Sequence, residues 1–211
     1  MTPLVLAVLL ASPVGADAPA SLSKSMPKGV LLGAALNRDT IEGKDAVSAA
    51  IVAKHFSTVT SENILKWALV HPGPSRYDFG PADAYVEMGR TYNHKVIGHT
   101  LVWHNQTPKW VFEDKDGKRV DRDTLLARMR EHIRTVVGRY RGRVNGWDVC
   151  NEVITEEGAL RKSPWFEIAG EEYIAEAFKA AHEADPEAEL YYNDYNLSKP
   201  CLLYTSDAAD E

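Results

Sequence analysis

Apolar residues along this chain follow two different spacings. Short continuous apolar or β-branched runs predict strands that are covered on both faces. These runs are 29–36, 56–63, 95–104, 143–152 and 188–196. Between them, apolar residues recur every three or four positions, which predicts helices. The helical segments are 44–56, 81–93, 121–141 and 171–184, and either Asp121 or Asp123 is placed to cap the third.

The chain therefore alternates strand and helix four times and then adds a fifth strand. Such alternation predicts an α/β fold, in which a parallel sheet has helices outside it. Both a doubly wound sheet and a (β/α)₈ barrel fit the order of elements. No GxGxxG or GxxxxGK loop follows the first strand. The lack of a phosphate-binding glycine loop there favours the barrel.

Polar residues gather at the same end of successive strands. Glu62 and Asn63 end the second predicted strand, 99–104 ends the third with two histidines, and Asn151 and Glu152 end the fourth. The fifth ends with 193–196. In (β/α)₈ barrels, the carboxyl ends of the strands carry the chemistry. The agreement among four strand ends is a stronger indication of a site than any one of them.

Glu152 ends an apolar strand, where a carboxyl group loses part of its hydration. Such a group can keep a proton near neutral pH and donate it. The alternative is a structural glutamate paired with a loop arginine or lysine. Asn63 and Lys66 become neighbours if a helical turn follows the second strand, and together they suit the binding of hydroxyl groups. The alternative there is a helix cap beside a surface lysine.

Residues 99–110 contain two histidines and two tryptophans. On a regular strand, His99, Leu101 and Trp103 share one face and His104 points away, so the histidines make a poor metal pair. Trp103 beside a histidine at a strand end suits the stacking of a sugar ring, although a tryptophan there can equally belong to the core. In 190–196, Asn193 and Tyr195 share a face, or simply begin a loop.

Four stretches, in this order, carry a resemblance to a known family. They are "TSENILKW", "GHTLVWHNQTPKW", "NGWDVCNE" and "LYYNDYN". Together, from about Val30 to about Pro200, they resemble glycoside hydrolase family 10, the endo-β-1,4-xylanases. The resemblance implies a (β/α)₈ TIM barrel and retaining hydrolysis of xylan or xylo-oligosaccharides by a monomer, with no metal and no cofactor.

The resemblance also implies roles for individual residues. Glu152 corresponds to the general acid/base, and Asn151 to the residue that holds the sugar 2-hydroxyl. The other implied substrate-binding residues are Glu62, Asn63, Lys66, His99, Trp103, Gln106 and Tyr195. Adjacent residues on a regular strand face opposite ways, yet Asn151 and Glu152 should both reach the cleft. We therefore predict a bulge or the end of the strand at 151–152.

The chain departs from the family pattern at its carboxyl end. Retaining hydrolysis needs a second carboxylate, which the family carries on a strand near the end of the barrel. Only five strands are accounted for here, and a barrel takes roughly 250 residues. The stretch 201–211, "CLLYTSDAADE", has neither strand nor helix period. We expect residues 17–200 to be the first part of the barrel, 201–211 to be foreign sequence, and the chain alone to be inactive.

Composition and the first residues bear on location and partners. The net charge of −6 argues against nucleic acid and anionic membrane surfaces as partners. The apolar run 4–11, followed by small residues up to Ala16, predicts a signal peptide over 1–16 and a secreted protein, although no lysine or arginine precedes the run. Of the two cysteines, Cys150 is expected to pack as a small apolar residue.

Two other functions remain open at this point. A related barrel glycosidase that acts on β-1,4-glucan would also end its fourth strand in asparagine and glutamate. A catalytically dead, carbohydrate-binding barrel would have lost the acid/base glutamate, which this chain retains as Glu152.

Overall fold

The computed structural model describes residues 21–195 and residue 197. The predicted signal peptide, 1–16, and the predicted foreign tail, 201–211, lie outside the described residues. In the described part of the chain, no helix has both the length and the apolar character that crossing a membrane requires.

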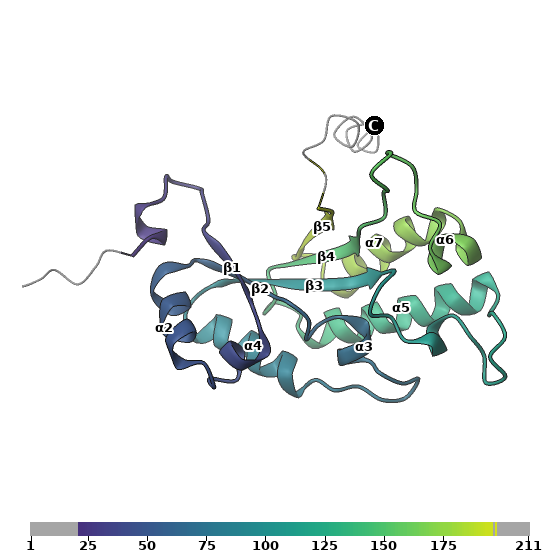
Figure 1. The fold of residues 1–211 in the computed structure, drawn as a ribbon, viewed down its shortest axis with the longest axis horizontal. Coiled ribbons are helices and arrows are strands. Elements are labelled where there is room, and N and C mark those ends of the chain that lie inside the picture. Colours follow the sequence, from purple (N-terminus) through teal and green to yellow (C-terminus); the bar gives the residue numbers. More distant parts are fainter. Residues whose placement is uncertain (1–20, 196, 198–211) are drawn as a thin grey trace, which may run out of the picture.

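Five strands form one parallel sheet, in which each strand pairs with its neighbour in the sequence (Figure 1). They are β1 (Gly33–Leu36), β2 (Thr58–Ser61), β3 (Lys95–Trp103), β4 (Gly146–Asn151) and β5 (Glu189–Asn193). A doubly wound sheet reverses its strand order part-way across. The unbroken order β1-β2-β3-β4-β5 instead matches a partial (β/α)₈ barrel, which confirms the predicted fold.

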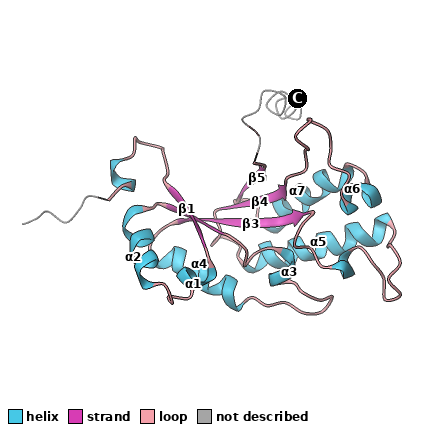
Figure 2. Ribbon diagram, in the orientation of Figure 1, coloured by secondary structure: helices cyan, strands magenta, loops and turns pink. Residues whose placement is uncertain are grey.

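Seven α-helices connect and cover the strands in the described part of the chain (Figure 2). They are α1 (Arg38–Ile41), α2 (Ala46–His55), α3 (Trp67–Val70), α4 (Gly80–Thr91), α5 (Arg122–Arg139), α6 (Pro164–Ala169) and α7 (Glu172–Ala184), with 3₁₀ turns at Ser23–Ser25 and Lys109–Val111. The four predicted helices are α2, α4, α5 and α7. The sequence pattern missed α1, α3 and α6, because one or two turns are too short to show a helical period.

Local chemistry explains the bounds of the longest helix, α5. The carboxylate of Asp121 accepts a hydrogen bond from the Thr124 N–H at 2.7 Å, so Asp121, and not Asp123, is the cap. The apolar residues spaced along α5 are buried. They are Leu125, Leu126, Met129, Ile133, Val136 and Val137. This stripe packs α5 against β3, while α4 packs on β2 and β3, and α7 on β4 and β5.

Strands β4 and β1 differ in how closely the apolar pattern of the sequence matches burial in the structure. All six residues of β4 are buried, and burial raises the pKa of the Cys150 thiol, which packs as an apolar group as predicted. The first predicted strand, in contrast, began too early. Val30 and Leu31 are about half exposed, at 51% and 50%, and β1 begins only at Gly33. An apolar run therefore overestimates a strand where its first residues face solvent.

A layer of aromatic rings and histidines lies between α3 and α5. The ring of His132 stacks on Trp67 with centroids 3.7 Å apart, and His71 stacks on Tyr77 at 3.8 Å. The Nδ1 atoms of the two histidines are 3.2 Å apart, so one donates a hydrogen bond to the other. Burial lowers the pKa of His132 well below its usual range, and burial also lowers that of His71. Both rings are therefore neutral near pH 7.

Candidate active site

Glu152 follows the last residue of β4 and lies at the rim of the sheet. The register of β4 against β5 shifts between Asp148 and Cys150, and Glu152 itself has a φ of +53°. This left-handed backbone costs about 1 kcal/mol for a residue other than glycine. It breaks the strict alternation of side chains, which confirms the predicted irregularity at 151–152. Asn151 and Glu152 consequently both line one small pocket, together with Trp103.

The Glu152 carboxylate is held from the neighbouring strand. The indole Nε1–H of Trp103, at the end of β3, donates to Oε2 of Glu152 at 2.9 Å. The Glu152 side chain keeps 22% of its surface exposed, so solvent or a ligand can still reach it. A carboxylate held by one donor and open on another side can exchange a proton with a bound molecule.

His104 also faces Glu152, which corrects one prediction. We expected His104 to point away from the cleft, yet its Nε2 lies 3.9 Å from Oε2 of Glu152. β3 ends at Trp103, and His104 begins the bend that follows, so the alternation of a regular strand no longer applies to it. Burial lowers the pKa of His104, and the charge of Arg161 lowers it further. His104 is therefore neutral near pH 7, beside the carboxylate.

Three polar side chains come together beside Trp103, namely Asn63, Lys66 and Gln106. The sequence predicted that the first two would be neighbours. Lys66 Nζ donates to Oδ1 of Asn63 at 3.0 Å, and Gln106 Nε2 donates to the same oxygen at 3.4 Å. The Lys66 ammonium also lies 4.6 Å from the centre of the Trp103 ring. Burial lowers the pKa of Lys66, although Glu152 and Glu62 act in the opposite direction. The four side chains give several hydrogen-bond donors next to an aromatic ring.

Asp148 is a site residue that the sequence did not reveal. Its Oδ2 lies 2.8 Å from Nδ1 of His99, and each side chain is less than one-fifth exposed. Asp148 belongs to β4, in the middle of an apolar run, where the strand pattern predicted only core. A carboxylate inside such a run was the one available signal, since burying it without a partner is costly.

The remaining predicted residues are Asn151, Glu62 and Tyr195. The Asn151 side chain is buried against β5, where Asn193 Nδ2 donates to its Oδ1 at 2.7 Å. Glu62 lines a central cavity on the face of the sheet, together with His99 and Asp148. Tyr195 is 58% exposed and lies two residues beyond β5. Among the described residues it lines neither the small pocket around Glu152 nor the central cavity, so the structure does not bring it into the cluster.

A cavity of about 560 Å³ opens on the face of the sheet within this rim. It is lined by Ala35, Thr60, Ser61, Glu62, Asn63, Lys66, His99, Asp148 and Asn193. These residues come from all five strands or from the segment just after β2, and His99 and Asp148 lie in the middle of theirs. In the part of the chain that is described, no three His, Cys, Asp or Glu side chains lie close enough together to hold a metal ion.

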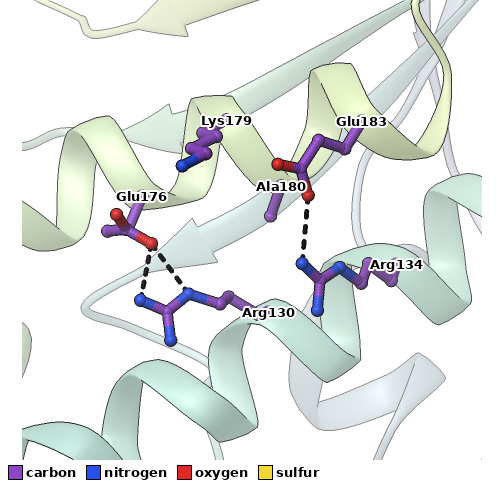
Figure 3. Close-up of a pocket in the computed structure, with 6 residues that line it drawn as sticks. All are labelled: Arg130, Arg134, Glu176, Lys179, Ala180 and Glu183. Atoms are coloured by element: carbon purple, nitrogen blue, oxygen red, sulfur yellow. Dashed lines mark hydrogen bonds and ion pairs between the residues drawn. The ribbon is translucent and has the colours of Figure 1, made fainter.

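A second groove, between α5 and α7, lies outside this site (Figure 3). Arg130 is paired with Glu176 at 2.6 Å, and Arg134 with Glu183 at 3.0 Å. The groove contains none of the predicted site residues. Its two arginines pair with its two glutamates across the helices, and surface pairs of this kind contribute about 0–1 kcal/mol each to stability.

Comparison with known proteins places the chain in a family. The profile described as glycosyl hydrolase family 10 matches residues 21–206. A β-1,4-xylanase of Dictyoglomus thermophilum is 51% identical over 152 residues, which are 71% of this chain and 42% of that protein. An endo-1,4-β-xylanase of Geobacillus stearothermophilus is 45% identical over 184 residues, or 85% of this chain and 54% of that protein.

Solved structures agree with the sequence comparison. A xylanase of Paenibacillus barcinonensis, complexed with a conduramine derivative, superposes with a TM-score of 0.86 at 40% identity, covering 92% of this chain and 58% of the other. Xylanase 10B of Thermotoga petrophila, in complex with xylobiose, gives 0.84 at 36% identity, covering 93% and 60%. This chain spans about half the length of the curated relatives it matches. It belongs to glycosyl hydrolase family 10.

Proposed function

We propose that this chain carries the acid/base half of an endo-1,4-β-xylanase, which hydrolyses β-1,4-xylosidic bonds with retention of configuration. The observation that carries the proposal is the Glu152 carboxylate, which is held by the Trp103 indole N–H at 2.9 Å on the rim of a partial barrel. Relatives named as xylanases, at 40–51% identity over most of this chain, support xylan as the substrate class.

In this proposal Glu152 acts twice in each turnover. It first gives its proton to the oxygen of the leaving sugar, and it later removes a proton from the water that attacks the glycosyl intermediate. The Trp103 N–H keeps the carboxylate in one orientation through both steps. His104, neutral at 3.9 Å from that carboxylate, can accept or donate a hydrogen bond without neutralising it by ion pairing.

The groups around the cavity would bind the sugar on the non-leaving side. Lys66, Asn63 and Gln106 offer donors and acceptors that match ring hydroxyls, and Glu62 adds an acceptor. His99 is oriented by Asp148, which fixes which ring nitrogen faces the cavity. Asn151 is placed beside Glu152, where the resemblance implies a contact to the 2-hydroxyl. Tyr195, exposed beyond β5, is the least supported member of the predicted set.

The proposal assigns the nucleophile to sequence that follows these five strands in the complete protein. Retaining hydrolysis needs a second carboxylate about 5–5.5 Å from the first. The 211-residue chain alone would then bind sugar weakly and hydrolyse nothing. We further propose that the complete protein is a secreted monomer, with residues 1–16 as the signal peptide, supported by the apolar run 4–11.

Assays of the complete protein test this proposal. We expect hydrolysis of xylan, much slower release from carboxymethylcellulose, and a β-anomeric first product in a proton NMR time course. Faster release from carboxymethylcellulose would favour a glucanase, and binding of xylo-oligosaccharides without turnover would favour a catalytically dead barrel. The 211-residue chain, purified and assayed in parallel, should show no turnover, and activity comparable with that of the complete protein would refute the placement of the nucleophile.

A further inference from the structure

The segment after β4 folds back on itself and returns to the strand end. Ile154 and Leu160 form an antiparallel bridge, and the Thr155 N–H donates to the Ala159 carbonyl at 2.8 Å. Gly158 supplies the positive φ, +81°, that the tight turn requires. The hairpin 154–160 therefore brings residue 161 back beside Glu152.

Arg161 hydrogen-bonds three consecutive carbonyls at this point. Its side-chain Nε donates to the carbonyl of Glu152 at 2.8 Å, and its Nη2 donates to that of Ile154 at 3.3 Å. Its backbone N–H donates to the carbonyl of Val153 between them, at 2.7 Å. One arginine thus satisfies the acceptors of the turn that carries Glu152.

The backbone of Glu152 determines where its carboxylate lies. Its N–H donates to the Asn193 carbonyl at 2.9 Å, so β5 holds one side of the residue and Arg161 holds the other. Between these two bonds the residue keeps its φ of +53°. In an extended backbone the side chain would point to the opposite face of the strand. The contact with Trp103 Nε1 depends on the left-handed conformation.

The charge of Arg161 acts on the same group of residues. The guanidinium and burial both lower the pKa of His104, while Glu152 and Asp194 raise it. The side chain of Arg161 donates its hydrogen bonds to backbone carbonyls and not to the Glu152 carboxylate. The carboxylate therefore stays free for proton exchange beside a neutral imidazole.

We propose that Arg161 is a positioning residue, which locks the left-handed backbone of Glu152 and so aims its carboxyl group at the leaving oxygen. This inference rests on the function proposed above. It concerns the first half of the reaction, in which Glu152 must be protonated and correctly placed. Arg161 itself touches no substrate atom in this account.

Two substrates distinguish a role of Arg161 in positioning Glu152 from a role in stabilising the fold as a whole. Breaking the sugar–sugar bond of a xylan-derived tetrasaccharide requires the proton of Glu152, whereas the dinitrophenyl group of an aryl β-xylobioside leaves without one. Their kcat/KM values both report steps up to the first bond cleavage. A misplaced acid lowers only the first value, and a damaged fold or cleft lowers both.

The experiment uses the complete protein with Arg161→Met, Arg161→Lys and the matched control Lys162→Met. Lys162 is exposed and lies over the Phe166 ring at 5.0 Å, so its loss removes the same charge without touching the turn. For Arg161→Met we expect kcat/KM on the tetrasaccharide to fall by about 100-fold, as for a displaced catalytic group. On the dinitrophenyl substrate we expect a change of less than about threefold.

Arg161→Lys, which keeps the charge but replaces the planar guanidinium fork by a single ammonium, should fall between wild type and Arg161→Met, and it carries the test if Arg161→Met does not fold. Equal losses on both substrates, or no loss beyond that of Lys162→Met, would overturn the positioning role. A wild-type protein inactive on both substrates would refute the proposed function itself, and this inference with it.

Discussion

The buried histidine pair predicts that the fold weakens on mild acidification. His132 is fully buried and His71 nearly so, at 0% and 2% exposure. Their Nδ1 atoms share a hydrogen bond at 3.2 Å, and Nε2 of His132 has no hydrogen-bond partner within the described part of the chain. A proton added to either ring would bury a charge, and one added to the accepting Nδ1 would also set two N–H groups against each other.

The sign and size of this effect follow from the lowered pKa of each ring. An unfolded histidine takes up a proton near pH 6.5, whereas folded His132 does so only well below that. The stabilisation is therefore complete above pH 6.5 and is lost as the pH falls below it. Each pH unit costs up to about 1.4 kcal/mol, so His132 alone accounts for at most about 2 kcal/mol between pH 6.5 and pH 5. His71 adds less, because a backbone hydrogen bond with Pro74 and the charge of Glu131 both oppose the lowering of its pKa by burial.

Urea unfolding of the complete protein between pH 7.5 and pH 5, followed by tryptophan fluorescence, measures this loss. His132→Phe keeps a ring on Trp67 but cannot titrate, so its stability deficit against wild type should shrink from pH 7 to pH 5, by at most about 2 kcal/mol. The control is His182→Gln, on the exposed face of α7, which should follow the wild-type pH dependence. A deficit for His132→Phe that stays constant with pH would refute the assignment of a buried, neutral pair.

Three further substitutions test packing, capping and the site. In Gly98→Ala the added Cβ would lie 2.2 Å from the Trp147 ring, so we expect a loss of about 1–3 kcal/mol in denaturant unfolding, and no loss would contradict that packing. Asp121→Ala should cost about 1 kcal/mol by the same measurement, because the α5 cap is removed. Trp103→Phe removes the N–H that holds Glu152, and kcat on xylan should fall roughly tenfold; unchanged kcat would mean that this bond does not orient the acid.

The sequence pattern was sufficient for the order of elements. Continuous apolar runs and helical spacing are strong signals where burial is complete, as in β4 and along α5. The same signals fail at solvent-facing ends, which is why the first strand was begun four residues early, at Gly29 instead of Gly33. Neither run nor spacing can show a helix as short as α3, since one turn contains no repeat.

The site could be predicted only in part. Successive side chains alternate between the two faces of a regular strand, and this rule fails where the backbone is irregular. Glu152, Trp103, Asn63 and Lys66 come together as expected, since parallel strands share one carboxyl edge. His104 was placed on the wrong face because the apolar pattern continued the third strand to residue 104, whereas β3 ends at Trp103. Asp148 and Arg161 were missed for a related reason, as each acts through a contact that only the folded chain reveals.

The most direct test of the central claim is Glu152→Gln in the complete protein, with turnover of xylan and affinity for xylotetraose measured side by side. Glutamine keeps the size and the acceptor for the Trp103 N–H but cannot deliver a proton. We predict that kcat falls by about 10²–10⁴-fold while the calorimetric Kd stays within about twofold of wild type. Retained turnover would contradict the role of Glu152 as the acid/base.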